Sequence, residues 1–152
     1  MQQALGLLED CQASPDVPVA ALVLSPQGEV LGIGLNRREV LGDPTAHAEV
    51  EAIRQAVKVY GDGWRLEGCT LVVTLEPCAM CAGTIMNSRV SRVIFGAYEP
   101  KTGACGSVLD VLRDPILRPN PEVIGGIAAA ECSAVLEDFF QRLRGLHVTK
   151  DA

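Results

Sequence analysis

Two short runs, Val17–Leu24 and Cys69–Leu75, constrain the fold of this chain most strongly, because nearly all of their residues are apolar. Runs of this kind are typical of strands that are buried on both faces of a sheet. After the first run, a Ser-Pro-Gln-Gly turn leads into Glu29–Leu35, which predicts the second arm of a hairpin. The sequence therefore predicts a central sheet with helices packed on both of its sides.

The rest of the chain predicts alternating helices and strands. Ala46–Val59 has the apolar spacing of an amphipathic helix, and Pro77 suits the first position of a helix that ends at Met86. The other expected elements are a first helix at Gln2–Ala13, a strand at Val90–Gly96, a loop-rich region 97–120 with a short helical piece at Gly106–Leu112, a last strand at Glu122–Ile127 and a final helix at Ala128–Leu143. We expect a three-layer α/β/α fold with a mixed sheet of about five strands, its hairpin on one side and its parallel strands on the other.

Composition limits the classes of protein to which the chain can belong. Its 152 residues predict a single domain, 1–152, with a core at about 17–144. A formal net charge of −6 counts against indiscriminate binding of nucleic acid, although it allows local basic patches. The N-terminal residues lack the basic region of a signal peptide, and no apolar run is long enough to span a bilayer. We therefore expect a cytoplasmic protein with no membrane partner, whose six cysteines are thiols or metal ligands.

Two of the predicted helices begin where polar and sulfur-containing residues gather. Each follows a strand, so right-handed crossovers would bring both helix starts to the same edge of the sheet. Ligands bind at this edge in such folds. The two starts carry His47-Ala48-Glu49 and Pro77-Cys78-Ala79-Met80-Cys81.

These residues have the chemistry of a zinc site. Cys78 and Cys81 are three positions apart and share one helix face, and the helix dipole favours their thiolate form. With the imidazole of His47 they make a Cys2His set for tetrahedral Zn²⁺. Three protein ligands leave one position for a water molecule, which is typical of a catalytic zinc site, and Glu49 is placed to move that water's proton. A structural metal or metal-free thiols are the alternatives. Cys11, Cys69, Cys105 and Cys132 are expected to be structural, the last three as small buried side chains.

The sequence around these motifs resembles the bacterial tRNA-specific adenosine deaminases, from about Val17 to Arg144. The resemblance is carried by residues 43–49 (DPTAHAE), 74–83 (TLEPCAMCAG), 88–89 (SR), 93–97 (VIFGA), 101–104 (KTGA), 106–107 (GS), 131–132 (EC) and 138–140 (DFF). It implies a cytidine-deaminase-like fold and hydrolysis of the wobble adenosine of a tRNA anticodon to inosine, with release of ammonia. It also implies one Zn²⁺ per subunit, a homodimer, and the tRNA anticodon stem-loop as partner.

The resemblance assigns roles to individual residues. His47, Cys78 and Cys81 would be the zinc ligands, and Glu49 would carry protons as the catalytic residue. The implied substrate-binding residues are Asn36, Ala48, Glu99, Lys101 and Phe140. Glu99 departs from the aspartate of the enterobacterial pattern, and the C-terminal tail is shorter and less basic.

Other interpretations of these residues remain open. Asn36 could instead close a turn, and Phe139 or Phe140 could belong to the core. Residues 87–106 carry a local charge of about +2, the size of patch that would suit a single anticodon loop. The chain could also deaminate a free base or nucleoside such as cytosine, cytidine or guanine, or it could be a non-catalytic RNA-binding partner subunit.

Overall fold

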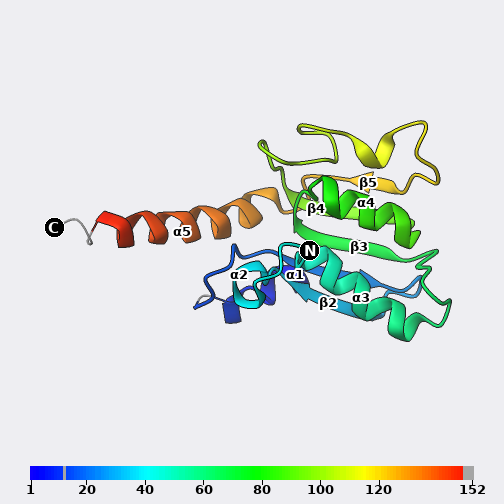
Figure 1. Ribbon diagram of the computed structural model, residues 1–152, viewed down its shortest axis with the longest axis horizontal. Helices are drawn as coiled ribbons and strands as arrows, with labels where there is room; N and C mark the ends of the chain where they lie inside the picture. The colour runs from blue at the N-terminus through cyan, green and yellow to red at the C-terminus, as the bar shows by residue number, and fades with distance from the viewer. Residues whose placement is uncertain (12, 149–152) are drawn as a thin grey trace.

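The computed structural model describes residues 1–11 and 13–148, which form a five-stranded mixed sheet between helices (Figure 1). In spatial order the strands are β2 (Val30–Leu35), β1 (Ala20–Leu24), β3 (Thr70–Leu75), β4 (Arg92–Ala97) and β5 (Glu122–Ile124). β1 is antiparallel to both of its neighbours, whereas β3, β4 and β5 are mutually parallel. The predicted hairpin beside a group of parallel strands is confirmed.

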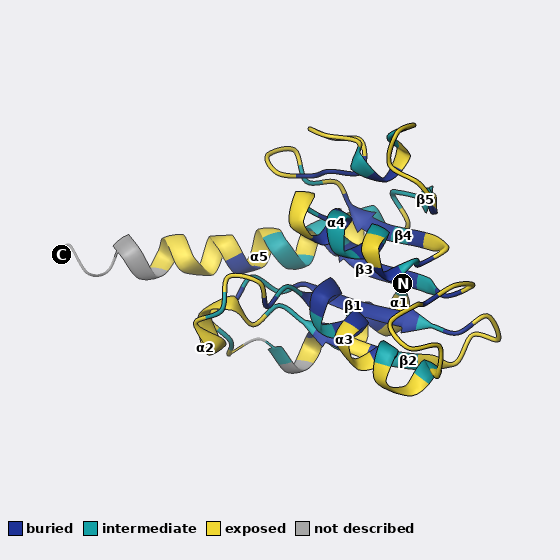
Figure 2. Cartoon of the chain, turned by 45° about the vertical axis from the view of Figure 1, so that its right-hand side comes forward, coloured by how far each residue is buried: buried dark blue, intermediate teal, exposed yellow. Residues whose placement is uncertain are grey.

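Helices cover both faces of the sheet. Ala21 and Val23 of β1 point into a core that also contains side chains of α3 (Ala48–Tyr60) and α4 (Ala79–Ser88). Ala20 and Leu22 point the other way, toward α1 (Gln2–Gly6) and α5 (Ala129–Val148). Figure 2 shows the central strands as the buried layer between these helices. The three-layer α/β/α architecture is therefore confirmed, and the double-sided burial explains the apolar runs.

Several predicted element boundaries were wrong. The first helix does not reach Ala13: α1 ends at Gly6, and a separate 3-10 turn, η1, follows at Glu9–Cys11. α4 begins at Ala79 rather than at Pro77, because Cys78 has an extended backbone and caps the helix. The last strand stops at Ile124, and the next residue, Gly125, lies close against the ring of Phe95.

Further differences occur at other ends and in the loops. α3 runs to Tyr60 and α5 runs to Val148, each beyond its predicted end. The short helical piece predicted at Gly106–Leu112 is instead a 3-10 turn, η2, at Val111–Arg113.

A short helix that the sequence did not predict, α2 (Arg38–Leu41), lies between β2 and α3. The buried carboxylate of Asp16 stabilises its first turn, because it accepts hydrogen bonds from the amides of Glu39, at 2.7 Å, and Val40, at 3.3 Å. Gly42 ends the helix in a left-handed conformation (φ 59°). The stabilising contact comes from a distant part of the chain, so no local pattern could predict this helix.

Two glycines of β2 allow α3 to lie against the sheet at very short range. A Cβ atom added at Gly34 would be 1.8 Å from the carbonyl oxygen of Ala48, and one added at Gly32 would be 2.2 Å from that of Ala52. Only residues without a side chain permit this approach. The position of the start of α3 is therefore fixed by β2.

The chain's one tryptophan lies near the amino end of β3. Trp64 lies in the loop between α3 and β3 and is 53% exposed. The guanidinium groups of Arg65 and Arg89 lie 4.8 Å and 6.0 Å from the centre of its ring. Within residues 1–11 and 13–148, no helix has both the length and the apolar character needed to cross a membrane.

Candidate active site

The two helix starts singled out in the sequence meet at one edge of the sheet. β2 and β3 both run antiparallel to β1, so their carboxyl ends point the same way. His47 caps the N-terminus of α3 after β2, and Cys78 caps that of α4 after β3. The predicted convergence of these segments is confirmed, and Cys81 joins them from the first turn of α4.

The side chains of His47, Cys78 and Cys81 have the spacing of metal ligands. Nδ1 of His47 lies 3.7 Å from Sγ of Cys78 and 3.5 Å from Sγ of Cys81. Zinc–ligand bonds of about 2.0–2.3 Å at tetrahedral angles give donor separations of about 3.5–3.8 Å. In the described part of the chain, these three residues are the group whose ligand atoms all lie within 4.8 Å of one another. The geometry therefore fits a single Zn²⁺ ion.

The electrostatics of the cluster favour a thiolate. The pKa of Cys78 is lowered to about 4, chiefly because the Cys81 side chain hydrogen-bonds to its sulfur and the His47 imidazole also stabilises the negative charge. The pKa of Cys81 is raised, since its thiol is held as the donor in that contact and is buried. A metal that replaced these protons would find one preformed thiolate and a second sulfur beside it.

Glu49 lies beside the cluster without being part of it. The residue is only 4% exposed and occupies the first turn of α3, two positions after His47. Burial raises the pKa of its carboxyl group above the ordinary value. A buried carboxyl group with a raised pKa can both take up and return a proton near neutral pH.

A pocket of about 200 Å³ opens onto these groups. Its polar and charged lining includes His47, Cys78 and Glu49, and its apolar wall comes from residues between Val17 and Phe140. The other lining residues are Val17, Val19, Asn36, Arg38, Ala48, Leu75, Glu76, Glu99, Thr102, Leu136 and Phe140.

Four of the five residues predicted to bind substrate line this pocket, namely Asn36, Ala48, Glu99 and Phe140. Lys101 does not line it: its side chain is exposed, and its amide donates to a carboxylate oxygen of Glu99 at 2.8 Å. Phe139, in contrast, is buried and packs edge-on against Phe140. The alternative that one of the two phenylalanines belongs to the core is thus correct for Phe139.

Asn36 presents an unused hydrogen-bond acceptor. Its Nδ2 donates to the carbonyl oxygen of Val17 at 3.0 Å, which fixes the orientation of the side chain. Its Oδ1 is the one buried side-chain oxygen or nitrogen among the described residues that lacks a hydrogen-bond partner. Buried polar atoms are normally satisfied, so an unpartnered acceptor on a residue that lines the pocket favours a ligand that brings a donor.

Three polar or charged lining residues, Arg38, Thr102 and Glu76, were not among the predicted site residues. The sequence drew attention to Arg38 as a basic neighbour of Asn36 and to Thr102 within the Lys-Thr-Gly-Ala segment, but neither was predicted to be a site residue. Glu76 directly precedes Pro77 and Cys78, and its role depends on a loop that comes later in the chain.

Comparison with known proteins places these features among deaminases. Residues 1–97 match the cytidine and deoxycytidylate deaminase zinc-binding region. The chain is 43% identical over 144 residues to a tRNA-specific adenosine deaminase of Haemophilus influenzae and 41% identical to that of Bacillus subtilis, and the matches cover 83% and 88% of those proteins. It is also 45% identical to a tRNA(Ile)-lysidine synthase of Deinococcus deserti, of which it spans only 27%.

Solved structures give the same picture. A structure from work on A-to-I editing by tRNA:A34 deaminases at the wobble position is 38% identical, with a TM-score of 0.82 over 90% of this chain and 97% of that one. The guanine deaminase of Bacillus subtilis is also 38% identical, but its TM-score is 0.59 and only 64% of this chain is covered. The likeness to the wobble-position deaminase is therefore the more complete of the two.

Proposed function

Since the chain belongs to the cytidine and deoxycytidylate deaminase family, and within it to the tRNA-specific adenosine deaminases, we propose that it converts the wobble adenosine of a tRNA anticodon to inosine. The observation that carries the proposal is the His47–Cys78–Cys81 cluster, with Glu49 beside it, at a pocket lined by Asn36, whose buried Oδ1 has no partner. The reaction adds water to the base and releases ammonia.

The proposed chemistry divides between the metal and the protein. Zn²⁺, held by His47, Cys78 and Cys81, would supply an acidified water molecule, whose pKa such sites lower to about 7. Glu49 takes a proton from the attacking water and delivers it to N1 of the adenine ring. It then passes the second proton to the exocyclic amine, which leaves as ammonia while C6 becomes a carbonyl carbon. Both protons thus come from the single water that is consumed.

The proposed binding of the base rests on the pocket lining. Oδ1 of Asn36 can accept only from an N–H or O–H group of the substrate, so this residue selects the edge of the base or a ribose hydroxyl. The ring of Phe140, which is 43% exposed, offers a face on which a base can stack. Ala48 and Glu99 form further parts of the pocket wall. Arg38, at the pocket wall, and Lys101, outside it, would then contact phosphates of the RNA.

We extend the proposal to the partners of the chain. The substrate is the anticodon stem-loop, and a tRNA substrate places the activity in the cytoplasm. A homodimer fits the exposed apolar residues of the segment after β4, which are Tyr98, Val108, Leu109, Ile116 and Leu117. A single catalytic domain that spans the chain remains part of this proposal.

The proposal is tested by measuring inosine and ammonia release from an anticodon stem-loop with adenosine at the wobble position. Matched reactions contain a stem-loop with guanosine there, free adenosine, cytidine, cytosine and guanine. We expect turnover of the first RNA alone. Turnover of a free base or nucleoside would instead assign a small-molecule deaminase, and RNA binding without any turnover would assign a non-catalytic subunit.

A further inference from the structure

The carboxylate of Glu76 binds several points of one loop. Glu76 follows β3, directly before Pro77, and is only 2% exposed. Its Oε1 accepts from the amides of Cys105 and Ser107, each at 3.0 Å, and its Oε2 accepts from the amide of Glu99 at 3.0 Å and from the hydroxyl of Ser107. Four donors from residues 99–107 therefore converge on one buried charge.

The loop also lies directly against the turn that carries the metal ligand. Gly103 pairs with Cys78 in an isolated β-bridge, and the amide of Ala104 donates to the carbonyl oxygen of Pro77 at 2.8 Å. A Cβ atom added at Gly103 would be 2.5 Å from the Glu76 carboxylate. The close contact between loop and turn therefore depends on the absence of a side chain at Gly103.

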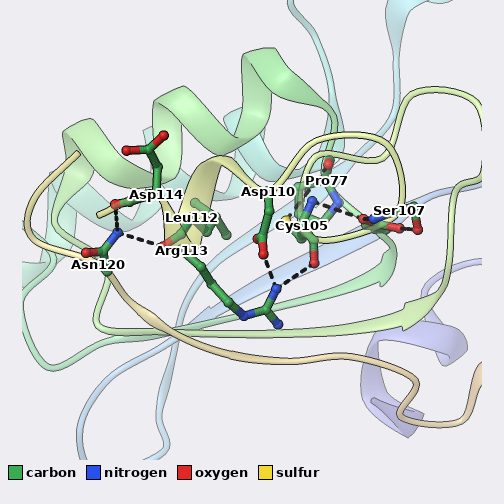
Figure 3. A network of polar contacts seen from close by, with 9 residues as sticks. Pro77, Cys105, Ser107, Asp110, Leu112, Arg113, Asp114 and Asn120 are labelled. Carbon is green, nitrogen blue, oxygen red and sulfur yellow. Dashed lines mark hydrogen bonds and ion pairs between the residues drawn. The ribbon is translucent and has the colours of Figure 1, made fainter. Parts of the chain in front are cut away.

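A second set of contacts supports the far side of the loop. Nη1 of Arg113 donates to the carbonyl oxygen of Cys105 at 2.9 Å and to the carboxylate of Asp110 at 3.0 Å (Figure 3). Asn120 donates to two more carbonyl oxygens of this region (Figure 3). The loop is thus held from within by Glu76 and from outside by Arg113.

The same loop supplies part of the pocket wall. Glu99 and Thr102 line the pocket, whereas the amides of Cys105 and Ser107 donate to Glu76. Burying a carboxylate costs free energy unless several donors compensate it. The four donors satisfy that need here, so any change in the Glu76 side chain acts first on the position of the loop.

We propose that Glu76 is a positioning residue, which holds the substrate-facing loop 99–107 at a fixed place relative to the ligand turn 76–78. The inference rests on the proposed function for its substrate, the anticodon stem-loop. Glu76 does not touch the reacting atoms in this proposal: it acts through Glu99 and Thr102. Its loss should weaken substrate binding more than it slows the chemical step.

Two variants test the proposal, one by changing the carboxylate of Glu76 and one by changing the loop that it holds. Glu76→Gln keeps the shape of the side chain but turns an NH2 group toward amides that need an acceptor. Gly103→Ala leaves the charge in place and pushes the loop away from it. Glu29→Gln, at an exposed carboxylate, and Gly6→Ala, where an added Cβ atom meets nothing within 4 Å, are the matched controls.

Three quantities are measured for each variant: KM and kcat with the stem-loop, bound zinc, and hydrogen exchange of the Glu99, Cys105 and Ser107 amides. We expect both test variants to raise KM about ten-fold or more, the size of effect of one lost charge-assisted hydrogen bond. We also expect kcat to change less than KM, zinc to remain bound, and the three amides to exchange faster. The controls should match the wild-type protein.

An unchanged KM together with unchanged exchange in Gly103→Ala would overturn the proposal, and this result decides the matter even if Glu76→Gln fails to fold. A fall in kcat at constant KM would also overturn it. If the wild-type protein does not deaminate the stem-loop, the proposed function fails. Hydrogen exchange then still tests whether Glu76 holds the loop.

Discussion

The close contact between β2 and α3 gives a prediction that can be worked out from distances. In Gly34→Ala the new Cβ atom would lie 1.8 Å from the carbonyl oxygen of Ala48, whereas ordinary van der Waals contact begins near 3.4 Å. The start of α3 must therefore withdraw by about 1.6 Å, the difference between these distances. His47 precedes Ala48 and moves with it, but Cys78 and Cys81 belong to α4 and stay in place.

The expected effect is large because the ligand distances have little tolerance. Separations of 3.5 Å and 3.7 Å would become too long for one tetrahedral ion. We expect loss of most bound zinc, a fall in kcat/KM of about 100-fold or more, and a loss of about 1–3 kcal/mol of stability from overpacking.

Zinc is measured by elemental analysis, stability by urea unfolding, and kcat/KM with the anticodon stem-loop. Gly145→Ala is the control, since an added Cβ atom there meets nothing within 4 Å. A Gly34→Ala protein that kept its zinc and turned over within two-fold of the wild type would refute the argument that β2 sets the position of the site.

Three further predictions concern the site and its surroundings. Glu49→Gln should keep its zinc and its fold but lose about 10²–10⁴-fold in kcat, because the amide cannot carry protons; turnover close to that of the wild type would exclude the proposed proton transfer. Chelation of zinc should abolish turnover while the far-ultraviolet circular dichroism stays unchanged, because the packed cores on both faces of the sheet hold the fold together. Zn²⁺ added back should restore activity. Burial raises the pKa of Cys105 from 9.0 to about 12, so native-state stability should fall as the pH rises from 9 toward 12. The Cys105 thiol should also resist alkylation at pH 8, which is measured by labelling followed by mass spectrometry. Rapid labelling of this thiol in the folded protein would contradict the prediction.

The parts of the fold that local sequence determines were predicted well. The apolar residues of β1 and β3 face helices on both sides, which is why their pattern alone revealed a three-layer protein. The convergence of His47 with the two cysteines followed from topology and the handedness of crossovers. These features depend on short segments and on general rules of chain connection.

The features that sequence missed depend on contacts between distant residues. α2 exists because Asp16 accepts hydrogen bonds from its first turn, 23 residues away along the chain. Glu76 is bonded to residues up to 31 positions later, and nothing in its immediate neighbours indicates this. The helix predicted as far as Ala13 was too long, since apolar spacing does not show where the turn after Gly6 changes direction. The zinc, proton-transfer and substrate roles of individual residues stay predictions.

The location of Trp64 has a practical consequence for spectroscopy. Because the chain's single indole lies at the amino ends of the parallel strands, far from the mouth of the pocket, its emission should report whether the domain is folded and should not respond to occupancy of the pocket. The contacts of the Arg65 and Arg89 guanidinium groups with its ring would be lost on denaturation, which changes the surroundings of the indole. Melting curves recorded with and without RNA can therefore be compared without a contribution from contact between the ligand and this indole.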